Sequence, residues 1–477
     1  MTIREIVRAT QGILVIGDPR MNVGQGGNVS IDSRTLRKGD IFFAIKGQRT
    51  DGHAHLEDSI KKGASLCVVS QIPEDIVIQP SASPALVKVR DTKRSLGDVA
   101  RSYREKYGAG VKRVGIAGSC GKTTVKEMIS GILKMTAPTI ASPGNFNNEI
   151  GCPLSIFGLE PAHAFGVFEI GASGRGEVRR LSDIVAPHVA VITNIRLEHT
   201  ETFGTLADIA EGEAEILEAL ENGGTAVLPR EDPFFDFMAG KIPGEKKAKV
   251  LSFGFSPEAH VSAKDISAWP GPVKFTLVHR DDAGKTLSET PCTLPVLGRF
   301  NVLNACTAAA AALSLGISPQ KISSGLADFS LMPMRFEVIP LKNDIVLVND
   351  AYNSNPGSVR SSVEAFAEAF SNRRLVAVLG DMLELGEIST REHEDLGRFL
   401  AGFPLTKIIL YGAQSKFTHQ GAKRALVDPK AVLHCADKES LLLSVEKAIQ
   451  PGTAVLFKAS RGIRLEETVQ KVAAHYL

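Results

Sequence analysis

The stretch that decides the fold of this chain is Arg113-Val114-Gly115-Ile116-Ala117-Gly118-Ser119-Cys120-Gly121-Lys122-Thr123-Thr124. Its first five residues are mostly apolar and predict a short buried strand that runs directly into a glycine-rich turn. Beyond the turn, apolar side chains recur at the spacing of one helix face, at Val125, Met128, Ile129, Ile132 and Leu133. Such a turn aims backbone N–H groups and the positive end of the helix dipole at an anion. The stretch therefore predicts a phosphate-binding loop.

The loop contains the residue types that nucleotide phosphates require. Glycine permits the tight turn and a close approach, Lys122 supplies a cation for the outer phosphates, and the Thr123 hydroxyl is a suitable magnesium ligand. We expect ATP contacts along the whole loop, at Gly118, Ser119, Cys120, Gly121, Lys122, Thr123 and Thr124. The usual spacing G-x-x-x-x-G-K-[ST] is not met, since its first glycine would fall at Ile116. The competing explanation is a chance Gly-Lys-Thr at a helix start.

Patterns on either side of the loop divide the chain into three α/β segments. A chain of 477 residues exceeds one ordinary core, and we expect domains at 1–107, 108–330 and 331–477. In the second segment strands alternate with helices, which predicts a parallel sheet covered on both faces, and an alanine-rich helix is expected at 304–315. The third segment repeats the alternation and predicts a Rossmann-like domain, without the GxGxxG fingerprint of dinucleotide binding.

Composition excludes several classes of function. The chain has 55 basic and 53 acidic side chains, a net charge of +2, and no basic block, so a nucleic-acid partner is not expected. Its six cysteines are scattered without a CxxC pair, which argues against a zinc site or a disulfide framework. We find no signal-peptide pattern and no apolar run of about 20 residues that would span a membrane. These features predict a cytoplasmic protein with a small-molecule partner.

Two further residues are candidates for a metal site beside the loop. Glu169 ends an apolar strand, the position at which α/β sheets place their ligands, although it is also compatible with a surface charge. His199 follows the next strand, and a single histidine in a loop is commonly no more than polar surface. The sequence alone leaves both alternatives open.

Several stretches together resemble the Mur ligases, ATP-dependent enzymes that form the amide bonds of the peptidoglycan stem peptide. The resemblance spans essentially the whole chain, in the family order of UDP-substrate domain, ATPase domain and C-terminal domain. It is carried by the compressed loop, by Glu169 and by His199 after Thr193-Asn194. It is also carried by Gly298-Arg299-Phe300-Asn301-Val302-Leu303-Asn304-Ala305.

Within the family, the chain is most similar to the type that adds D-alanyl-D-alanine to UDP-N-acetylmuramoyl-tripeptide. The stretches that carry this similarity are 144–151, 350–356, 380–386 and 458–461. The resemblance implies ATP and Mg²⁺ as cofactors, an acyl-phosphate intermediate, and closure of the C-terminal domain over the site; we also expect a monomer. The alternatives are a sister ligase that adds a single amino acid and, from another class, a phosphate-loop switch or transport ATPase.

The resemblance also assigns roles to individual residues. It implies that Lys122, Glu169, His199 and Arg335 are catalytic, and that Thr123, Glu169 and His199 hold the metal. ATP contacts are implied at Asn301, Arg335 and Asp350. Asn304 is alternatively the N-cap of the alanine-rich helix. The implied substrate contacts are Ser33, Arg34, Asn147, Asn148, Tyr352, Asn353 and Asn355, although Asp32-Ser33-Arg34 and the Asn147-Asn148 pair also suit ordinary turns.

Glu213 marks a departure from the family pattern. Most members have a carbamylated lysine at this position, which directs a carboxylate toward a second magnesium ion. Glu213 is already a carboxylate, on a shorter side chain. It is therefore expected either to support the metal, directly or through water, or to be a solvated helix residue.

Overall fold

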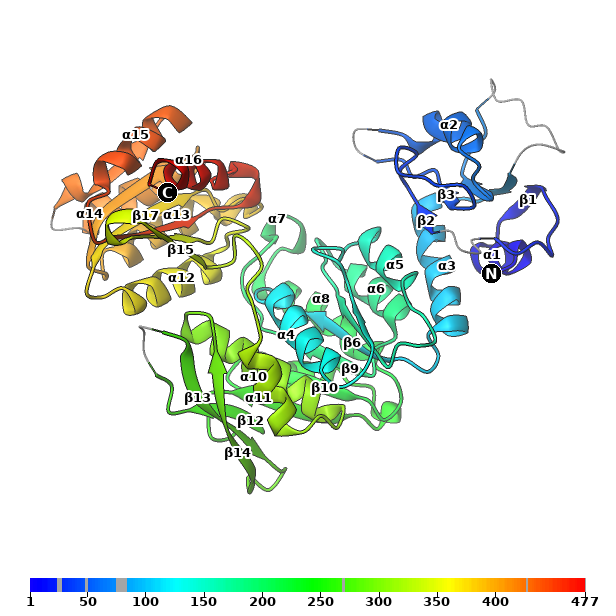
Figure 1. Ribbon diagram of the computed structural model, residues 1–477, viewed down its shortest axis with the longest axis horizontal. Coiled ribbons are helices and arrows are strands. Elements are labelled where there is room, and N and C mark those ends of the chain that lie inside the picture. The colour runs from blue at the N-terminus through cyan, green and yellow to red at the C-terminus, as the bar shows by residue number, and fades with distance from the viewer. Residues whose placement is uncertain (24–27, 48–49, 74–83, 268–270, 426–427, 477) are drawn as a thin grey trace.

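The computed structural model describes residues 1–23, 28–47, 50–73, 84–267, 271–425 and 428–476. Within these residues the strands form three sheets, one in each of three α/β regions that follow one another along the chain (Figure 1). The α/β class and the three-part organisation predicted from the sequence are confirmed. No helix in the described part of the chain is long and apolar enough to cross a membrane.

The N-terminal region contains a five-stranded sheet in the order β1-β5-β4-β3-β2, parallel except for β1 against β5. Its elements are α1 (Ile3–Thr10), β1 (Ile13–Ile16), β2 (Val29–Ser30), β3 (Ile41–Phe43), the 3-10 helix η1 (Gly52–His55), α2 (Leu56–Lys61), β4 (Leu66–Val69), β5 (Ala85–Lys88) and α3 (Thr92–Tyr107). The long helix α3 also packs against α5 and α6 of the middle region, so it connects the two.

The middle region is built on a nine-stranded sheet in the order β14-β13-β12-β11-β10-β9-β6-β8-β7. Its strands are β6 (Lys112–Ala117), β7 (Thr139–Ala141), β8 (Phe165–Glu169), β9 (Val189–Ile192), β10 (Thr225–Pro229), β11 (Lys249–Gly254), β12 (Val261–Lys264), β13 (Val273–Arg280) and β14 (Thr286–Leu294). Its helices are α4 (Lys122–Lys134), α5 (Gly151–Ile156), α6 (Glu177–Val185), α7 (Thr200–Phe203), α8 (Leu206–Glu218), α9 (Phe235–Gly240), η2 (Gly244–Lys246), α10 (Arg299–Ser314) and α11 (Pro319–Ala327).

The expectation of a purely parallel middle sheet is wrong at one edge. Strands β7 to β12 are parallel, but β13 and β14 form an antiparallel hairpin added to β12. Val273, Phe275 and Leu277 of β13 are buried, whereas Lys274 between them is exposed, the alternation of a strand with one covered face. The parallel part is covered on both faces as predicted, by separate apolar cores under α4, α10 and α11 and under α5, α6 and α8.

The C-terminal region has a six-stranded sheet in the order β15-β16-β20-β17-β18-β19, in which only the β15–β16 pair is antiparallel. Its strands are β15 (Glu337–Leu341), β16 (Ile345–Asn349), β17 (Arg374–Gly380), β18 (Leu405–Tyr411), β19 (Val432–Cys435) and β20 (Thr453–Lys458). Its helices are η3 (Lys342–Asp344), α12 (Pro356–Ala369), η4 (Gly386–Ile388), α13 (Ser389–Leu400), α14 (Ser415–Ala425), η5 (Pro429–Ala431), α15 (Lys438–Ala448), η6 (Arg461–Ile463) and α16 (Glu466–Tyr476). It lies at the opposite end of the molecule from the N-terminal region (Figure 1).

Candidate active site

The loop predicted to bind phosphate connects β6 to α4, at the carboxyl ends of the central parallel strands. Gly118 has φ +110° and Gly121 has φ +85°, values that favour glycine. A Cβ atom on Gly118 would clash with Thr193, which directly follows the neighbouring strand β9, and one on Gly121 would lie 2.7 Å from the Asn304 side-chain oxygen. Both glycines are therefore required by backbone conformation and by space.

Asn304 lies inside α10 and contacts the loop from there. The N-cap of α10 is Gly298, so the alternative that Asn304 caps this helix is wrong. The Asn304 amide donates to Asn301 Oδ1 at 3.2 Å, while Asn301 donates to the Leu297 carbonyl at 2.6 Å. Asn301 is buried, and its side chain is thus engaged within its own helix.

The backbone of the loop is held by side chains from elements far away in the sequence. The Cys120 N–H donates to Asn194 Oδ1 at 3.0 Å, and the Asn194 amide donates back to the Cys120 carbonyl at 3.0 Å. The Gly118 N–H donates to Glu213 Oε2 on α8 at 2.6 Å. Glu213 is only 1% exposed, so the expectation that it is a solvated helix residue is wrong.

Lys122, the first residue of α4, lies among negative charges. Its ammonium group donates to the Gly118 carbonyl and lies 3.5 Å from Glu198 Oε1. Burial by itself lowers the pKa of Lys122, but the charges of Glu198, Glu213 and Glu169 outweigh it and raise the pKa overall. Lys122 is therefore a fully charged cation in front of the loop.

Glu198 is a residue that the sequence interpretation missed. It is 6% exposed, and burial raises the pKa of its carboxyl group to about 8, against the opposing charge of Lys122. An acid directly before His199, in the stretch that follows a buried strand, was visible in the sequence. Its role was not, because the contact with Lys122 depends on β9 lying next to β6.

Glu169 ends β8, and its carboxylate is only half satisfied. Oε1 accepts from the Asn147 amide at 2.8 Å, whereas Oε2 is buried with no hydrogen-bond partner among the described residues. A buried carboxylate oxygen without a donor is costly. An unpartnered oxygen of this kind suits a hard cation such as Mg²⁺.

The other two predicted metal ligands make contacts with the C-terminal region. The Thr123 hydroxyl accepts from the Arg335 guanidinium at 3.0 Å, and His199 Nδ1 lies 2.6 Å from Glu384 Oε2. No group of three or more His, Cys, Asp or Glu side chains arranged for a metal ion is found in the part of the chain that the structure describes. The orphaned Glu169 oxygen and the Thr123 hydroxyl fit a divalent cation, and the complete ligand set stays a prediction.

The C-terminal region brings several predicted residues onto the loop. Arg335 reaches Thr123, and its guanidinium lies 4.0 Å from the centre of the Tyr352 ring. The Asn355 amide donates to Cys120 Sγ at 3.2 Å while its carbonyl oxygen caps α12. The contact between the middle and C-terminal regions thus includes predicted site residues from both regions.

Asp350 and Asn353 have their contacts within the C-terminal region. The Asp350 carboxylate accepts from Lys458 at 2.7 Å and from the Ser362 hydroxyl at 2.6 Å. Lys458 also donates to the Asn353 carbonyl at 3.0 Å. Contact of Asp350 with a nucleotide ribose stays a prediction, and its carboxylate is already occupied in this state.

The remaining predicted residues lie toward the N-terminal region. Arg34 is 86% exposed in its side chain and pairs with Asp32 at 2.7 Å, while the Ser33 carbonyl accepts from Lys62. Asn148 Oδ1 accepts from the N–H groups of Ile150 and Gly151, so this residue does form the turn that starts α5.

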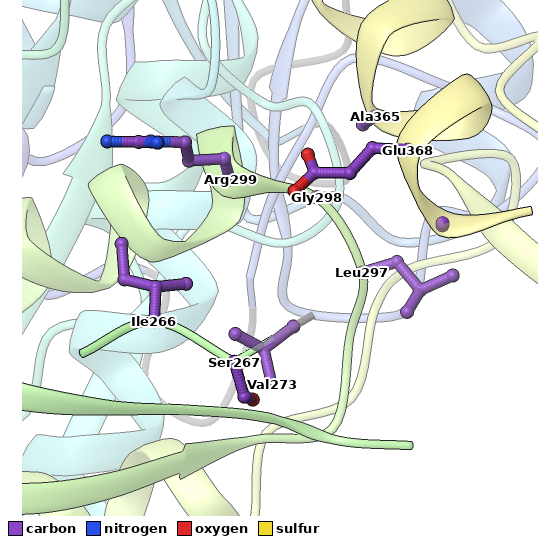
Figure 2. Close-up of a pocket in the computed structure, with 9 residues that line it drawn as sticks. Ile266, Ser267, Val273, Leu297, Gly298, Arg299, Ala365 and Glu368 are labelled. Carbon is purple, nitrogen blue, oxygen red and sulfur yellow. The ribbon is translucent and has the colours of Figure 1, made fainter. Parts of the chain in front are cut away.

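Two hollows lie where the middle and C-terminal regions meet. One, of about 80 Å³, opens between α12 and the segments around Ser267 and Gly298, and its lining includes Arg299 and Glu368 (Figure 2). The other, of about 260 Å³, is lined by Leu197, Phe234 and Pro356, together with Arg196 and Arg360. Arg196 connects this second hollow to the phosphate loop, because its backbone exchanges hydrogen bonds with the Ser119 hydroxyl.

Comparison with known families gives matches along most of the chain. Residues 27–104 match the model described as the Mur ligase family catalytic domain, 116–312 the Mur ligase middle domain, and 334–461 the Mur ligase glutamate ligase domain.

Individual relatives match from end to end. The UDP-N-acetylmuramoyl-tripeptide–D-alanyl-D-alanine ligase of Bacillus subtilis is 30% identical over 98% of this chain and 97% of its own. A crystal structure of MurF from Acinetobacter baumannii superposes with a TM-score of 0.88 at 31% identity, covering 99% of this chain and 98% of that one. The structure of MurF ligase from Thermotoga maritima in complex with ADP has a TM-score of 0.81 at 26% identity, covering 95% and 99%.

Proposed function

This chain belongs to the Mur ligase family, and on that premise we propose that it adds D-alanyl-D-alanine to UDP-N-acetylmuramoyl-tripeptide with consumption of ATP. The observation that carries the proposal is the end-to-end similarity to ligases of this specificity, at 30% identity over 98% of the chain. Use of ATP agrees with the glycine loop between β6 and α4 and with the ADP complex of a relative. The reaction belongs to the synthesis of cell-wall precursors, and we propose the cytoplasm as its location and a monomer as the active form.

The chemistry requires activation of a carboxylate. Hydroxide is a poor leaving group, so an amine does not displace it from a carboxylic acid at a useful rate. In the proposed reaction, an oxygen of the tripeptide carboxylate attacks the γ-phosphorus of ATP, and ADP leaves. The free amine of the dipeptide then attacks the acyl carbon, phosphate leaves with the carboxylate oxygen, and the amine loses a proton.

The residues around the loop suit phosphoryl transfer of this kind. Lys122 from α4 and Arg335 from the C-terminal region place two cations at the phosphate loop, where the charge of the transferring group develops. Arg335 reaches the loop only because the C-terminal region contacts the middle region. In the proposed reaction, the same contact serves to exclude water, which would otherwise hydrolyse an acyl phosphate.

We propose that Thr123, Glu169 and His199 hold Mg²⁺, with Glu213 as a further candidate. When bound, Mg²⁺ neutralises phosphate charge and orients the transferring group. The unpaired buried oxygen of Glu169 supports this assignment, since a buried carboxylate oxygen without a donor favours a cation beside it.

The three regions have distinct roles in the proposal. Residues 1–107 hold the UDP-substrate, with Ser33 and Arg34 among its contacts, 108–330 bind ATP, and 331–477 bind the dipeptide and close over ATP. Asn147 and Asn148, between the first two regions, contact the sugar and peptide. Further ATP contacts are Asn301 and Asp350, and further dipeptide contacts are Tyr352, Asn353 and Asn355.

The test is acceptor-dependent phosphate release from ATP with UDP-N-acetylmuramoyl-tripeptide present, with D-alanyl-D-alanine compared against single amino acids. We expect phosphate release only with the dipeptide, and a product whose mass is the tripeptide precursor plus the dipeptide less water. Release supported by a single amino acid would instead identify a sister ligase. Release that needs neither substrate would identify a simple ATPase.

A further inference from the structure

The first amide of the phosphate loop is bound to a carboxylate of the protein. The Gly118 N–H donates to Glu213 Oε2 at 2.6 Å, and both residues are buried. Glu213 comes from α8, which covers the face of the sheet opposite to α4. This amide is therefore already paired inside the protein, with a side chain from the α8 face of the sheet.

The compressed spacing of the loop explains why this contact is needed. Ile116, where the usual pattern would have its first glycine, lies within β6 and pairs with Glu169 and Val191 on the two neighbouring strands. The chain must therefore leave the strand abruptly at Gly118, with φ +110°. A buried N–H at such a turn needs an acceptor, since leaving it unpaired is costly.

The same turn also determines the position of the loop lysine. The Gly118 carbonyl accepts from the Lys122 ammonium group, which pairs in turn with Glu198. Glu213, Gly118, Lys122 and Glu198 thus form one connected chain of polar contacts. A shift of Gly118 would move Lys122 and the amides that follow it.

We propose that Glu213 is a positioning residue, whose carboxylate holds the Gly118 amide and thereby places Lys122 and the loop for the nucleotide phosphates. The inference rests on the proposed use of ATP and assigns Glu213 a task that needs no metal. A positioning role can be distinguished from metal support by replacing Glu213 with glutamine. The side-chain oxygen of glutamine can accept the Gly118 hydrogen bond, but it carries no charge for Mg²⁺.

The experiment compares Glu213→Gln with Glu213→Ala by measuring the Kd of ADP calorimetrically, from no Mg²⁺ (with EDTA) to saturating Mg²⁺. We expect Glu213→Ala to weaken ADP binding about tenfold at every Mg²⁺ concentration, since a buried amide loses its acceptor. Glu213→Gln, which retains an acceptor, is expected to stay within about threefold of the wild type. Equal weakening of both variants, and only with Mg²⁺ present, would overturn the inference in favour of metal support.

Glu215 on the same helix provides a matched control. It is also buried and also accepts backbone N–H groups, from Gly176 and Arg179 at 2.9 Å, but at the start of α6 instead of the loop. Glu215→Ala is expected to lower the melting temperature without changing the Kd of ADP. An equal loss of ADP affinity in this variant would show that any damage to α8 has the same effect, and would overturn the inference.

Two further outcomes separate the inference from the proposed function. If the wild type bound no ADP at any Mg²⁺ concentration, the proposed function would fail. If the wild type and Glu213→Ala bound ADP equally, only the inference would fail. Should Glu213→Ala not fold, Glu213→Asp replaces it: the shorter carboxylate keeps the charge but not the reach, and wild-type ADP affinity in that variant would contradict the positioning role.

Discussion

Buried polar groups lie near both ends of strand β6, but their hydrogen bonding differs. At its amino end, Arg113 is buried and makes five hydrogen bonds, to the carbonyls of Val185, Ala186, Gly108 and Val111 and to Glu221. At its carboxyl end, the polar groups around the loop are crowded or unpaired. Strand β6 thus connects a well-paired arginine at one end to unpaired polar groups at the other.

The unpaired polar groups at the carboxyl end of β6 indicate a ligand-binding role. Glu169 Oε2 has no donor among the described residues, and burial raises the pKa of Glu198 to about 8. Such an arrangement costs stability and is retained where a ligand completes it. The amino end of β6 therefore serves the fold, and the carboxyl end serves the nucleotide.

The largest effect is expected from Lys122→Met. Removing the cation at the transferring phosphate should lower kcat by roughly 10²–10³-fold, the loss typical of one preorganised charge-stabilising donor. The melting temperature should change little, because the cost of burying the Lys122 ammonium group offsets the stability that its pairing with Glu198 provides. Steady-state kinetics and thermal unfolding check both expectations. A large loss of stability with retained kcat would show that Lys122 serves the fold instead of the nucleotide.

Glu169→Gln is expected to separate function from stability at the same end. The amide keeps an oxygen acceptor for Asn147 but removes the charge that we assign to the metal. We expect kcat to fall about 10²-fold with an unchanged or higher melting temperature, as active-site groups commonly cost stability. A variant that is destabilised yet fully active would show that this glutamate serves the fold.

Arg113→Met tests the amino end. Several buried carbonyls would lose a donor, so the free energy of unfolding should decrease by about 2–3 kcal/mol. The KM for ATP of the folded enzyme should stay unchanged, because the loop lies at the other end of the strand. Denaturant titration measures the first quantity and kinetics the second; a raised KM for ATP with unaltered stability would contradict the comparison.

The smallest expected effect is a pH dependence at the amino end. Burial, and then the charge of Arg113, lowers the pKa of His188 to about 4, and its Nδ1 accepts from the Arg113 N–H at 3.2 Å. The unfolded chain binds a proton near pH 6.5 and the folded chain only near pH 4, so stability falls as the pH decreases through that window.

The variant His188→Asn removes the titrating imidazole and retains a hydrogen-bond acceptor for the Arg113 N–H. Allowing for partial solvent exposure, the wild type should lose about 1 kcal/mol more than the variant between pH 7 and pH 5. Thermal unfolding at the two pH values measures the difference. Parallel curves for the two proteins would show that His188 does not contribute to the pH dependence.

The sequence predicted those parts of the site that depend on local pattern. The strand, the glycine loop and α4 are consecutive, so one stretch determined them, and Glu169 was recognisable from its place at a strand end. Glu198 and the bond from Glu213 to Gly118 were not predictable in the same way. These two contacts join residues that are 76 and 95 positions apart in the sequence. Both contacts depend on the order of strands in the sheet.

The antiparallel hairpin of β13 and β14 shows a second limit. The alternation of apolar and polar residues in β13 was present in the sequence, and the turn at Asp281 and Gly284 is typical of a hairpin. The regular alternation of strands and helices before it favoured a purely parallel sheet instead. The fold class followed from the repeated pattern, whereas the exception at the sheet edge required the packing to be known.

The most direct test of the account follows the oxygen of the activated carboxylate. The tripeptide carboxylate of UDP-N-acetylmuramoyl-tripeptide is labelled with ¹⁸O, and the phosphate released during ligation to D-alanyl-D-alanine is analysed by mass spectrometry. An acyl-phosphate reaction predicts transfer of a single ¹⁸O atom into phosphate with each amide bond formed. Phosphate free of ¹⁸O, released while the amide product accumulates, would contradict the account.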